Sequence, residues 1–324
     1  MNVEAGYYLD SFLAPLAPHL GRENVTDIYI NRPGEVWVES LGGTSERFEE
    51  PGLDEKTLER LARQIAATSS QGISRANPLL AAKLPDGSRI QIAAPPATRG
   101  GHALAIRRHV AADLSLDDWE DEAAFEDLLG SGAHFNDERT FRSLGAGEAG
   151  KVLRKAVIDR RNILVSGGTS SGKTTFLNAL LKEVPPQERL ILIEDTEELK
   201  VRHENAVGLI AARGELSEAN VSAEELLISA LRMRPDRIIL GELRGIEAFT
   251  FLRAVNTGHP GSMTTVHADT PQRAIEQLAL LVLQSGSKLS RDDVRHYVRE
   301  SVDVFVQLER RDGKRRVSQV LVAE

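Results

Sequence analysis

The sequence predicts an α/β protein with two domains: a C-terminal domain on a mainly parallel sheet and a smaller N-terminal α/β domain. A chain of 324 residues is long for one hydrophobic core and comfortable for two. From Lys151 onward, helix and strand signals alternate, which is typical of parallel strands joined by crossover helices. Three apolar runs without polar alternation indicate strands buried on both faces: Ile163 to Val165, Leu190 to Ile193 and Ile238 to Leu240.

The N-terminal elements follow from shorter patterns. The spacing of Tyr8, Phe12, Leu13 and Leu16 predicts an amphipathic helix that packs on its own domain. Two strands flank residues 31–34, where Pro33 followed by Gly34 favours a type II turn, because glycine adopts the required positive φ at little cost. The other elements that we expect here are a helix over 53–68 and strands over 88–94 and 102–108.

Composition excludes several classes of protein. An apolar content of 41% with 27% charged residues is ordinary for a globular protein, and the formal charge of −8 disfavours direct nucleic-acid binding. The absence of cysteine excludes disulfides, thiolate nucleophiles and cysteine-zinc modules, and it fits a reducing cytoplasm. We expect no secretory signal and no transmembrane segment, because the most apolar stretch, 278–283, is far shorter than the roughly 20 residues of a membrane span.

An acidic segment followed by Gly, Ser and Asn residues separates the two halves. It predicts a linker containing one helix at most. The expected boundaries are therefore an N-terminal α/β domain over 1–109, a linker over 110–145 and a C-terminal domain over 146–324.

The segment after the first buried strand matches the phosphate-loop pattern G-x-x-x-x-G-K-T. The glycines let backbone N–H groups face a β-phosphate, the lysine neutralises the β and γ oxygens, and the threonine hydroxyl coordinates Mg²⁺. An apolar stripe on the following helix supports the expected strand, loop and helix. The predicted nucleotide-binding residues are Gly167, Gly168, Thr169, Ser170, Ser171, Gly172, Lys173, Thr174 and Thr175.

Acidic residues follow the second buried strand. Because ligands of open α/β sheets lie at the carboxyl ends of the strands, Glu194 and Asp195 can reach Mg²⁺ or an attacking water. Glu197 and Glu198 lie further from the strand, and an exposed acidic turn is the alternative.

The third buried strand ends in Gly241 and Glu242, where most phosphate-loop ATPases carry a magnesium-binding aspartate. Glu242 can polarise a water in line with the γ-phosphate or hold Mg²⁺ through water. A structural pair with Arg244 is the alternative. Before this strand, Arg232, Arg234 and Arg237 are either surface charges or groups that reach a phosphate across a subunit boundary.

Two histidines flank the next predicted strand, Thr264 to Val266. His267 follows the strand and therefore lies at the same edge, where it either polarises the γ-phosphate or has a structural role. His259 precedes the strand. Thr270 and Pro271 then open the next helix as N-cap and first-turn proline.

Four segments resemble, in this order, the four boxes of the secretion ATPase superfamily: GGTSSGKTT, IEDTEEL, LRMRPDRIILGELRG and TGHPGSMTTVHAD. That superfamily serves type II secretion, type IV pili and type IV secretion. The resemblance implies a RecA-like core that uses ATP and Mg²⁺. It implies a catalytic or Mg²⁺-linked carboxylate at Glu242, an acidic box at Glu194 and Asp195 with Asp195 on the metal, and a γ-phosphate-facing His267. It also implies a nucleotide-binding arginine from the N-terminal domain, best matched by Arg107. Among the arginines before the third buried strand, Arg232 is the candidate for a catalytic contact with a phosphate.

Within that superfamily, INRPGEVWVE and LPDGSRIQIAAPP resemble the traffic ATPases of type IV secretion. The tight-adherence pilus ATPases share GH-x-GS and stay open as an alternative. The resemblance implies a homohexamer in the cytoplasm, peripheral to the inner membrane, that works with membrane and cytoplasmic components of a secretion machine in conjugation or effector export. ATP would bind between the two domains of one subunit, with a hinge over 110–145. A hexameric DNA translocase and an assembly scaffold that binds ATP without turnover also stay open.

Overall fold

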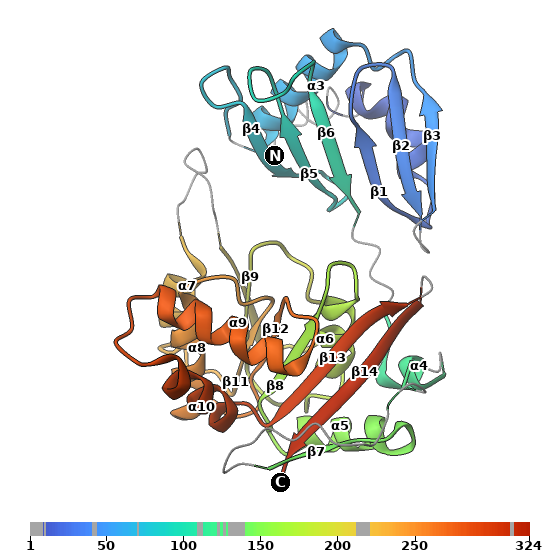
Figure 1. Ribbon diagram of the computed structural model, residues 1–324. Helices are drawn as coiled ribbons and strands as arrows, with labels where there is room; N and C mark the ends of the chain where they lie inside the picture. Colours follow the sequence, from blue (N-terminus) through green and yellow to red (C-terminus); the bar gives the residue numbers. More distant parts are fainter. Residues whose placement is uncertain are drawn as a thin grey trace. The chain divides into compact units, whose positions relative to one another are not determined.

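The computed structural model describes Leu9 and residues 11–40, 44–69, 71–108, 113–121, 124–125, 128, 140–211, 221–311 and 314–324. The chain divides into two compact units. The first comprises Met1–Val110 with Gly214–Asn220, and the second comprises Ala111–Arg213 with Val221–Glu324. Each unit has a sheet and a hydrophobic core of its own (Figure 1).

The first unit is a six-stranded antiparallel sheet in the order β3-β2-β1-β6-β5-β4. Its strands are β1 (Val25–Ile30), β2 (Glu35–Ser40), β3 (Ser45–Glu49), β4 (Leu79–Lys83), β5 (Arg89–Ala93) and β6 (Ala103–Arg107). Gly34, between β1 and β2, has φ +82°, which fits the expected turn. Two short helical segments, η1 (Ala14–Leu16) and α2 (Ala17–Leu20), precede β1.

Helix α3 (Glu55–Thr68) closes the core of this unit. It begins where the Asp54 carboxylate accepts a hydrogen bond from the Thr57 N–H at 2.7 Å, an N-cap that satisfies an otherwise unpaired donor. Leu58, Leu61 and Ile65 recur at helical spacing and are fully buried against the apolar side chains of the sheet. Leu9 and Leu16 lie in the same core, so the described part of the N-terminal segment packs within this unit.

The second unit is an eight-stranded sheet in the order β10-β9-β11-β12-β8-β13-β14-β7. The first six strands in this order pair in parallel, whereas β13 with β14 and β14 with β7 pair antiparallel. This confirms the mainly parallel sheet that the sequence predicts. The strands are β7 (Phe141–Ser143), β8 (Ile163–Gly167), β9 (Leu190–Glu194), β10 (Ala206–Ile210), β11 (Arg237–Leu240), β12 (Met263–Val266), β13 (Val304–Arg311) and β14 (Lys314–Ala323).

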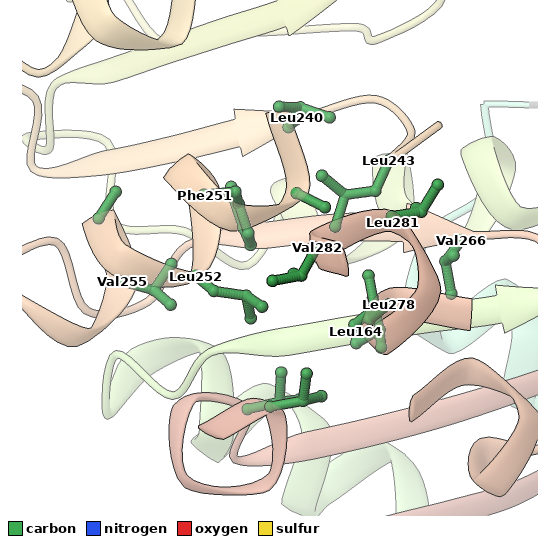
Figure 2. Close-up of a cluster of buried hydrophobic side chains, with 14 of the residues drawn as sticks. Leu164, Leu240, Leu243, Phe251, Leu252, Val255, Val266, Leu278, Leu281 and Val282 are labelled. Carbon is green, nitrogen blue, oxygen red and sulfur yellow. The ribbon is translucent and has the colours of Figure 1, made fainter. Parts of the chain in front are cut away.

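Helices on both faces bury this sheet in two separate clusters. One cluster gathers side chains of α7 (Ala223–Ala230), α8 (Glu247–Asn256), α9 (Pro271–Gln284) and α10 (Arg291–Ser301), and Figure 2 shows Phe251 and Leu278 within it. The other gathers side chains of α4 (Leu116–Asp121), α5 (Ala146–Ile158) and α6 (Lys173–Leu181). The continuous apolar runs of the strands are therefore buried on both sides.

Part of the segment expected to be a linker packs on the second unit. Trp119 of α4 lies edge-on against Phe176 of α6 with ring centroids 5.0 Å apart, and it is 1% exposed. The Asp113 carboxylate pairs with Lys182 at 2.8 Å and with Arg202 at 2.6 Å. Residues 109–112 and most of 122–139 lie outside the described residues. None of the helices in the described part of the chain has the length and apolar character that a membrane span requires.

At the amino end of β11, Arg237 is completely buried. Its guanidinium donates to both carboxylate oxygens of Glu188, at 2.6 and 2.9 Å, and to the Gly261 carbonyl at 3.4 Å. The sequence predicts either a surface charge or a phosphate-reaching group at Arg237. It is neither, because all of its contacts join the ends of strands within the sheet.

Candidate functional site

The predicted site residues follow neighbouring parallel strands. In the order β9-β11-β12-β8, Glu194 and Asp195 lie at the end of the first strand, Glu242 after the second and His267 after the third. The phosphate loop follows β8. Because the strands are parallel, all these residues lie at one edge of the sheet.

The phosphate loop curls between β8 and α6 through two left-handed residues, Ser170 at φ +59° and Gly172 at φ +95°. The Lys173 ammonium lies over the loop and donates to the carbonyl oxygens of Gly167 at 3.0 Å and Gly168 at 3.2 Å. A Cβ at Gly167 would lie 2.8 Å from the Leu308 carbonyl oxygen, so the close approach of β13 requires glycine there. Burial lowers the pKa of Lys173, and nearby Glu242 partly opposes that shift.

Glu242 lies at the centre of the edge. Hydrogen bonds fix the preceding Gly241 on both sides: its N–H donates to Ile193 at 2.9 Å, and its carbonyl accepts from Thr265 Oγ1 at 2.8 Å. One Glu242 oxygen, Oε2, pairs with Arg244. The other, Oε1, is buried and has no hydrogen-bond partner in the described structure.

Glu242 Oε1 faces two basic groups. It lies 4.0 Å from Lys173 Nζ and 3.5 Å from His267 Nε2, while the side chain as a whole is only 15% exposed. The pair with Arg244 that the sequence offered as a structural alternative does form, but it uses the opposite oxygen. Oε1 is thus a fixed acceptor directed toward the phosphate-loop lysine.

The two acids after β9 have different surroundings. Glu194 is buried, and its Oε1 accepts the N–H groups of Glu198 and Leu199 at 2.8 Å each, which holds the turn after the strand. Asp195 is partly exposed and accepts from Arg244 Nη1 at 3.1 Å. Arg244 therefore joins Asp195 to Glu242. The catalytic role of Glu194 and the metal role of Asp195 stay predictions.

His267 and His259 lie at opposite ends of β12, so only His267 reaches the phosphate-loop edge. Burial lowers the pKa of His267 below its ordinary value of 6.5, and the positive charge of Lys173 lowers it further, whereas Glu242 raises it. These surroundings therefore favour the neutral imidazole in the nucleotide-free protein. The next residue is held in place because Gln307 Nε2 of β13 donates to the Ala268 carbonyl at 3.1 Å.

This balance of charges makes a prediction for the nucleotide-free protein. Lys173→Met is expected to raise the His267 pKa by removing a cation, and Glu242→Gln is expected to lower it by removing an anion. The C–H signals of His267 in NMR spectra across pH 5 to 8 report the midpoint directly. Shifts of the same sign in the two variants would contradict this arrangement of charges.

Two predicted arginines are not among the residues that form this edge of the second unit's sheet. Arg232 is exposed in the segment between α7 and the amino end of β11, so it lies at the opposite edge from the phosphate loop. Arg107 belongs to the first unit, where its Nε donates to Asp27 Oδ1 at 2.8 Å. A role for Arg232 at a nucleotide therefore requires a neighbouring subunit, and both assignments stay predictions.

The residues at the edge fit a magnesium ion. Mg²⁺ takes oxygen ligands and usually keeps water and substrate phosphates in its coordination shell. Thr174 provides a hydroxyl in the first turn of α6, and Glu242 Oε1 is a buried oxygen that has no hydrogen-bond partner among the described residues. Asp195 can contribute only by sharing its carboxylate with Arg244.

Sequence reasoning missed the contribution of the last hairpin. Arg315 of β14 lies against the phosphate loop: a Cβ at Gly172 would be 2.8 Å from Arg315 Cδ. Arg315 Nη1 donates to Thr175 Oγ1 at 3.5 Å. The pair Asp312-Gly313 between two strand-like runs is a hairpin signal in the sequence, but nothing in it shows that the hairpin returns to the loop.

Comparisons with known proteins identify the family of this chain. The family model for the type II/IV secretion system protein matches residues 135–315. VirB11 of the type IV secretion system of Bartonella henselae is 40% identical over 324 residues, covering 95% of this chain and 91% of that protein. PtlH, a type IV secretion system protein of Bordetella pertussis, is 38% identical over 311 residues, covering 94% and 91%.

Solved structures give the same result. The VirB11 ATPase of the Brucella suis type IV secretion system, in complex with sulphate, is 35% identical, covers 97% of both chains and has a TM-score of 0.50. The pilus retraction motor PilT with bound ADP is 21% identical, covers 98% of this chain and 83% of its own, and supports the fold alone, with a TM-score of 0.62. The predicted fold class and the resemblance are both confirmed, and this chain belongs to the type II/IV secretion system protein family.

Proposed function

We propose that this protein is a Mg²⁺-dependent ATPase that energises assembly of, or transport through, a type IV secretion system. The observation that carries the proposal is the Glu242 oxygen between Lys173 and His267, at the edge where the phosphate loop begins α6. VirB11 and PtlH, the similar proteins, are named for type IV secretion, which favours this machine over a tight-adherence pilus. The net charge of −8 counts against a DNA translocase.

Each group at the edge has a part in the proposed reaction. The backbone N–H groups of the loop and the Lys173 ammonium bind the β- and γ-phosphates. Glu242 Oε1 accepts a proton from a water whose oxygen attacks the γ-phosphorus, while the bond from that phosphorus to the β–γ bridging oxygen breaks and its electrons stay on ADP. His267 Nε2 lies beside the same oxygen and orients the water. Bound Mg²⁺ would neutralise charge on the β and γ oxygens.

The assembly and its location extend the proposal. It includes a homohexamer in the cytoplasm, peripheral to the inner membrane. It also includes components of the secretion machine as partners, which the similarity to VirB11, a type IV secretion system protein, over nearly the whole chain supports. Domain closure over the nucleotide, with Arg107 as the contact from the first unit, belongs to the same proposal.

Lys173→Ala is the direct test of nucleotide binding. Loss of a charge-assisted contact to phosphate is expected to raise the Kd for ATP by roughly 10- to 100-fold. Titration of a fluorescent ATP analogue with excess Mg²⁺ measures the change. Lys151→Ala removes an exposed lysine from α5 and serves as the matched control.

Phosphate release by the wild-type protein, abolished by EDTA and restored by Mg²⁺, tests hydrolysis in the same preparation. Wild-type affinity in Lys173→Ala would exclude the phosphate loop as the binding site. Binding without any phosphate release would support the scaffold alternative.

A further inference from the structure

The end of the β13–β14 hairpin carries a group of cations beside the phosphate loop. Leu308 of β13 pairs with Gly167, the last residue of β8, so the residues after Leu308 extend beyond the carboxyl edge of the sheet. The described cations there are Arg310, Arg311, Lys314, Arg315 and Arg316. In the register of the two strands, Arg310 stands opposite Arg315, and Glu309 stands opposite Arg316.

Among these cations, Arg315 lies directly on the loop. Its side chain crosses Gly172, where a Cβ would come within 2.8 Å of Arg315 Cδ and 3.3 Å of Nε. The φ of +95° favours glycine at Gly172, and the absence of a Cβ there leaves room for this arginine. Nη1 reaches the hydroxyl of Thr175, which is 5% exposed, at 3.5 Å.

The residues of the phosphate loop indicate how the phosphates of a bound nucleotide are oriented. The Lys173 ammonium, with Glu242 and His267 beside it, marks the γ end. The N–H groups of a phosphate loop cradle the α- and β-phosphates, and Thr175 follows the residues that hold the β and γ oxygens and the metal. Arg315 contacts Thr175 and Gly172, so it lies toward the other end of the polyphosphate.

We infer that Arg315 binds the α-phosphate of the nucleotide, with Thr175 orienting its guanidinium. The assignment rests on the proposed nucleotide binding and adds to it a cation from a part of the chain outside the four boxes. Arginine presents a planar fork of donors that matches phosphate oxygens, and hydrogen bonds between ions are the stronger ones. The stem is already fixed across Gly172, so little side-chain freedom is lost on binding.

An α-phosphate contact has a kinetic signature. The α-phosphate is the same in ATP, in ADP and in the transition state, so Arg315 stabilises all three to a similar degree. Uniform binding of this kind changes KM without changing kcat. A group that acts on the γ-phosphate would instead affect ATP but not ADP, and it would change kcat.

The experiment compares Arg315→Ala with Arg316→Ala in the full-length protein. Both remove one positive charge from the same strand, but successive residues of a strand point to opposite faces, and Arg316 stands opposite Glu309 in the strand register. Arg315→Ala is expected to raise the Kd for ADP and for ATP by the same factor, about tenfold, and to raise KM with kcat unchanged. Arg316→Ala is expected to bind both nucleotides as the wild type does, and Arg315→Lys to lie between wild type and Arg315→Ala.

Several results would overturn the inference. Unchanged ADP binding in Arg315→Ala, loss of affinity for ATP alone, or an equal loss in Arg316→Ala would each exclude an α-phosphate contact. The thermal unfolding midpoint of each variant separates loss of binding from loss of folding, and Arg315→Lys supplies a second reading if the alanine variant is unstable. Failure of the wild type to bind ADP or ATP would instead contradict the proposed function itself.

Discussion

Glu242→Gln is expected to lower the rate of ATP hydrolysis by roughly 10²- to 10⁴-fold while ATP still binds, because a positioned general base contributes a factor of this size. Glutamine keeps the shape of the side chain and one carbonyl oxygen, but it cannot take the proton of the attacking water. Glu242 is the candidate base because its Oε1 is buried, has no hydrogen-bond partner in the described structure and lies 4.0 Å from the Lys173 ammonium.

Steady-state phosphate release and the Kd for ATP should be measured on the same preparation of Glu242→Gln. Glu197→Gln is the matched control, since it removes one negative charge from an exposed position in the segment after β9. If Glu242→Gln hydrolyses ATP at the wild-type rate, the residue is only the structural partner of Arg244. If it loses ATP affinity instead, its main role is to hold Mg²⁺ or the loop.

Much of this site could be predicted because the residues that follow parallel strands lie together at one edge of the sheet. A continuous apolar run predicts a strand buried on both faces, and the residue after such a run lies at the carboxyl edge. That reasoning alone predicts Glu242 and His267 at one edge. In the structure, Glu242 Oε1 lies 3.5 Å from His267 Nε2. The phosphate loop could also be predicted from the sequence, because its chemistry requires a fixed spacing of glycine and lysine.

Elements without a strong local pattern could not be predicted. Strand β3 is exposed at nearly every position, so it has no alternation of apolar and polar residues, and it forms only by pairing with β2 at the edge of its sheet. The hairpin of β13 and β14 has a local turn signal, but its contact with the loop joins Arg315 to Thr175, 140 residues apart. Such contacts depend on the strand order, which no window of sequence contains.

Charge in a sequence also does not reveal burial. Arg232 and Arg237 are close neighbours in one motif, yet Arg232 is exposed and Arg237 is completely buried. The difference lies in Glu188, 49 residues earlier, whose carboxylate meets the Arg237 guanidinium at two oxygens. A buried charge requires such a partner, so the pair is a strong constraint on the fold that only the structure shows.

Arg237→Met is expected to destabilise the second unit by roughly 3–5 kcal/mol, because it leaves the Glu188 carboxylate buried without its main counter-charge. The double variant Arg237→Met with Glu188→Gln should recover part of that loss, since the charge itself is then removed. Urea unfolding followed by the fluorescence of Trp119 measures the free energy of unfolding of this unit. The chain has two tryptophans, so a Trp37→Phe background removes the signal of the first unit.

The pH dependence of the same pair supplies an independent test. Burial raises the pKa of Glu188, but the hydrogen bonds and charge of Arg237 outweigh it and hold the pKa below the ordinary value of 4.5. A carboxylate with a lowered folded-state pKa stabilises the fold above its unfolded pKa and loses that contribution as the pH falls. Wild-type stability should therefore decline below about pH 4.5, and less steeply in Glu188→Gln. Equal slopes in the two proteins would show that the Arg237–Glu188 pair does not control acid unfolding, whatever its geometry.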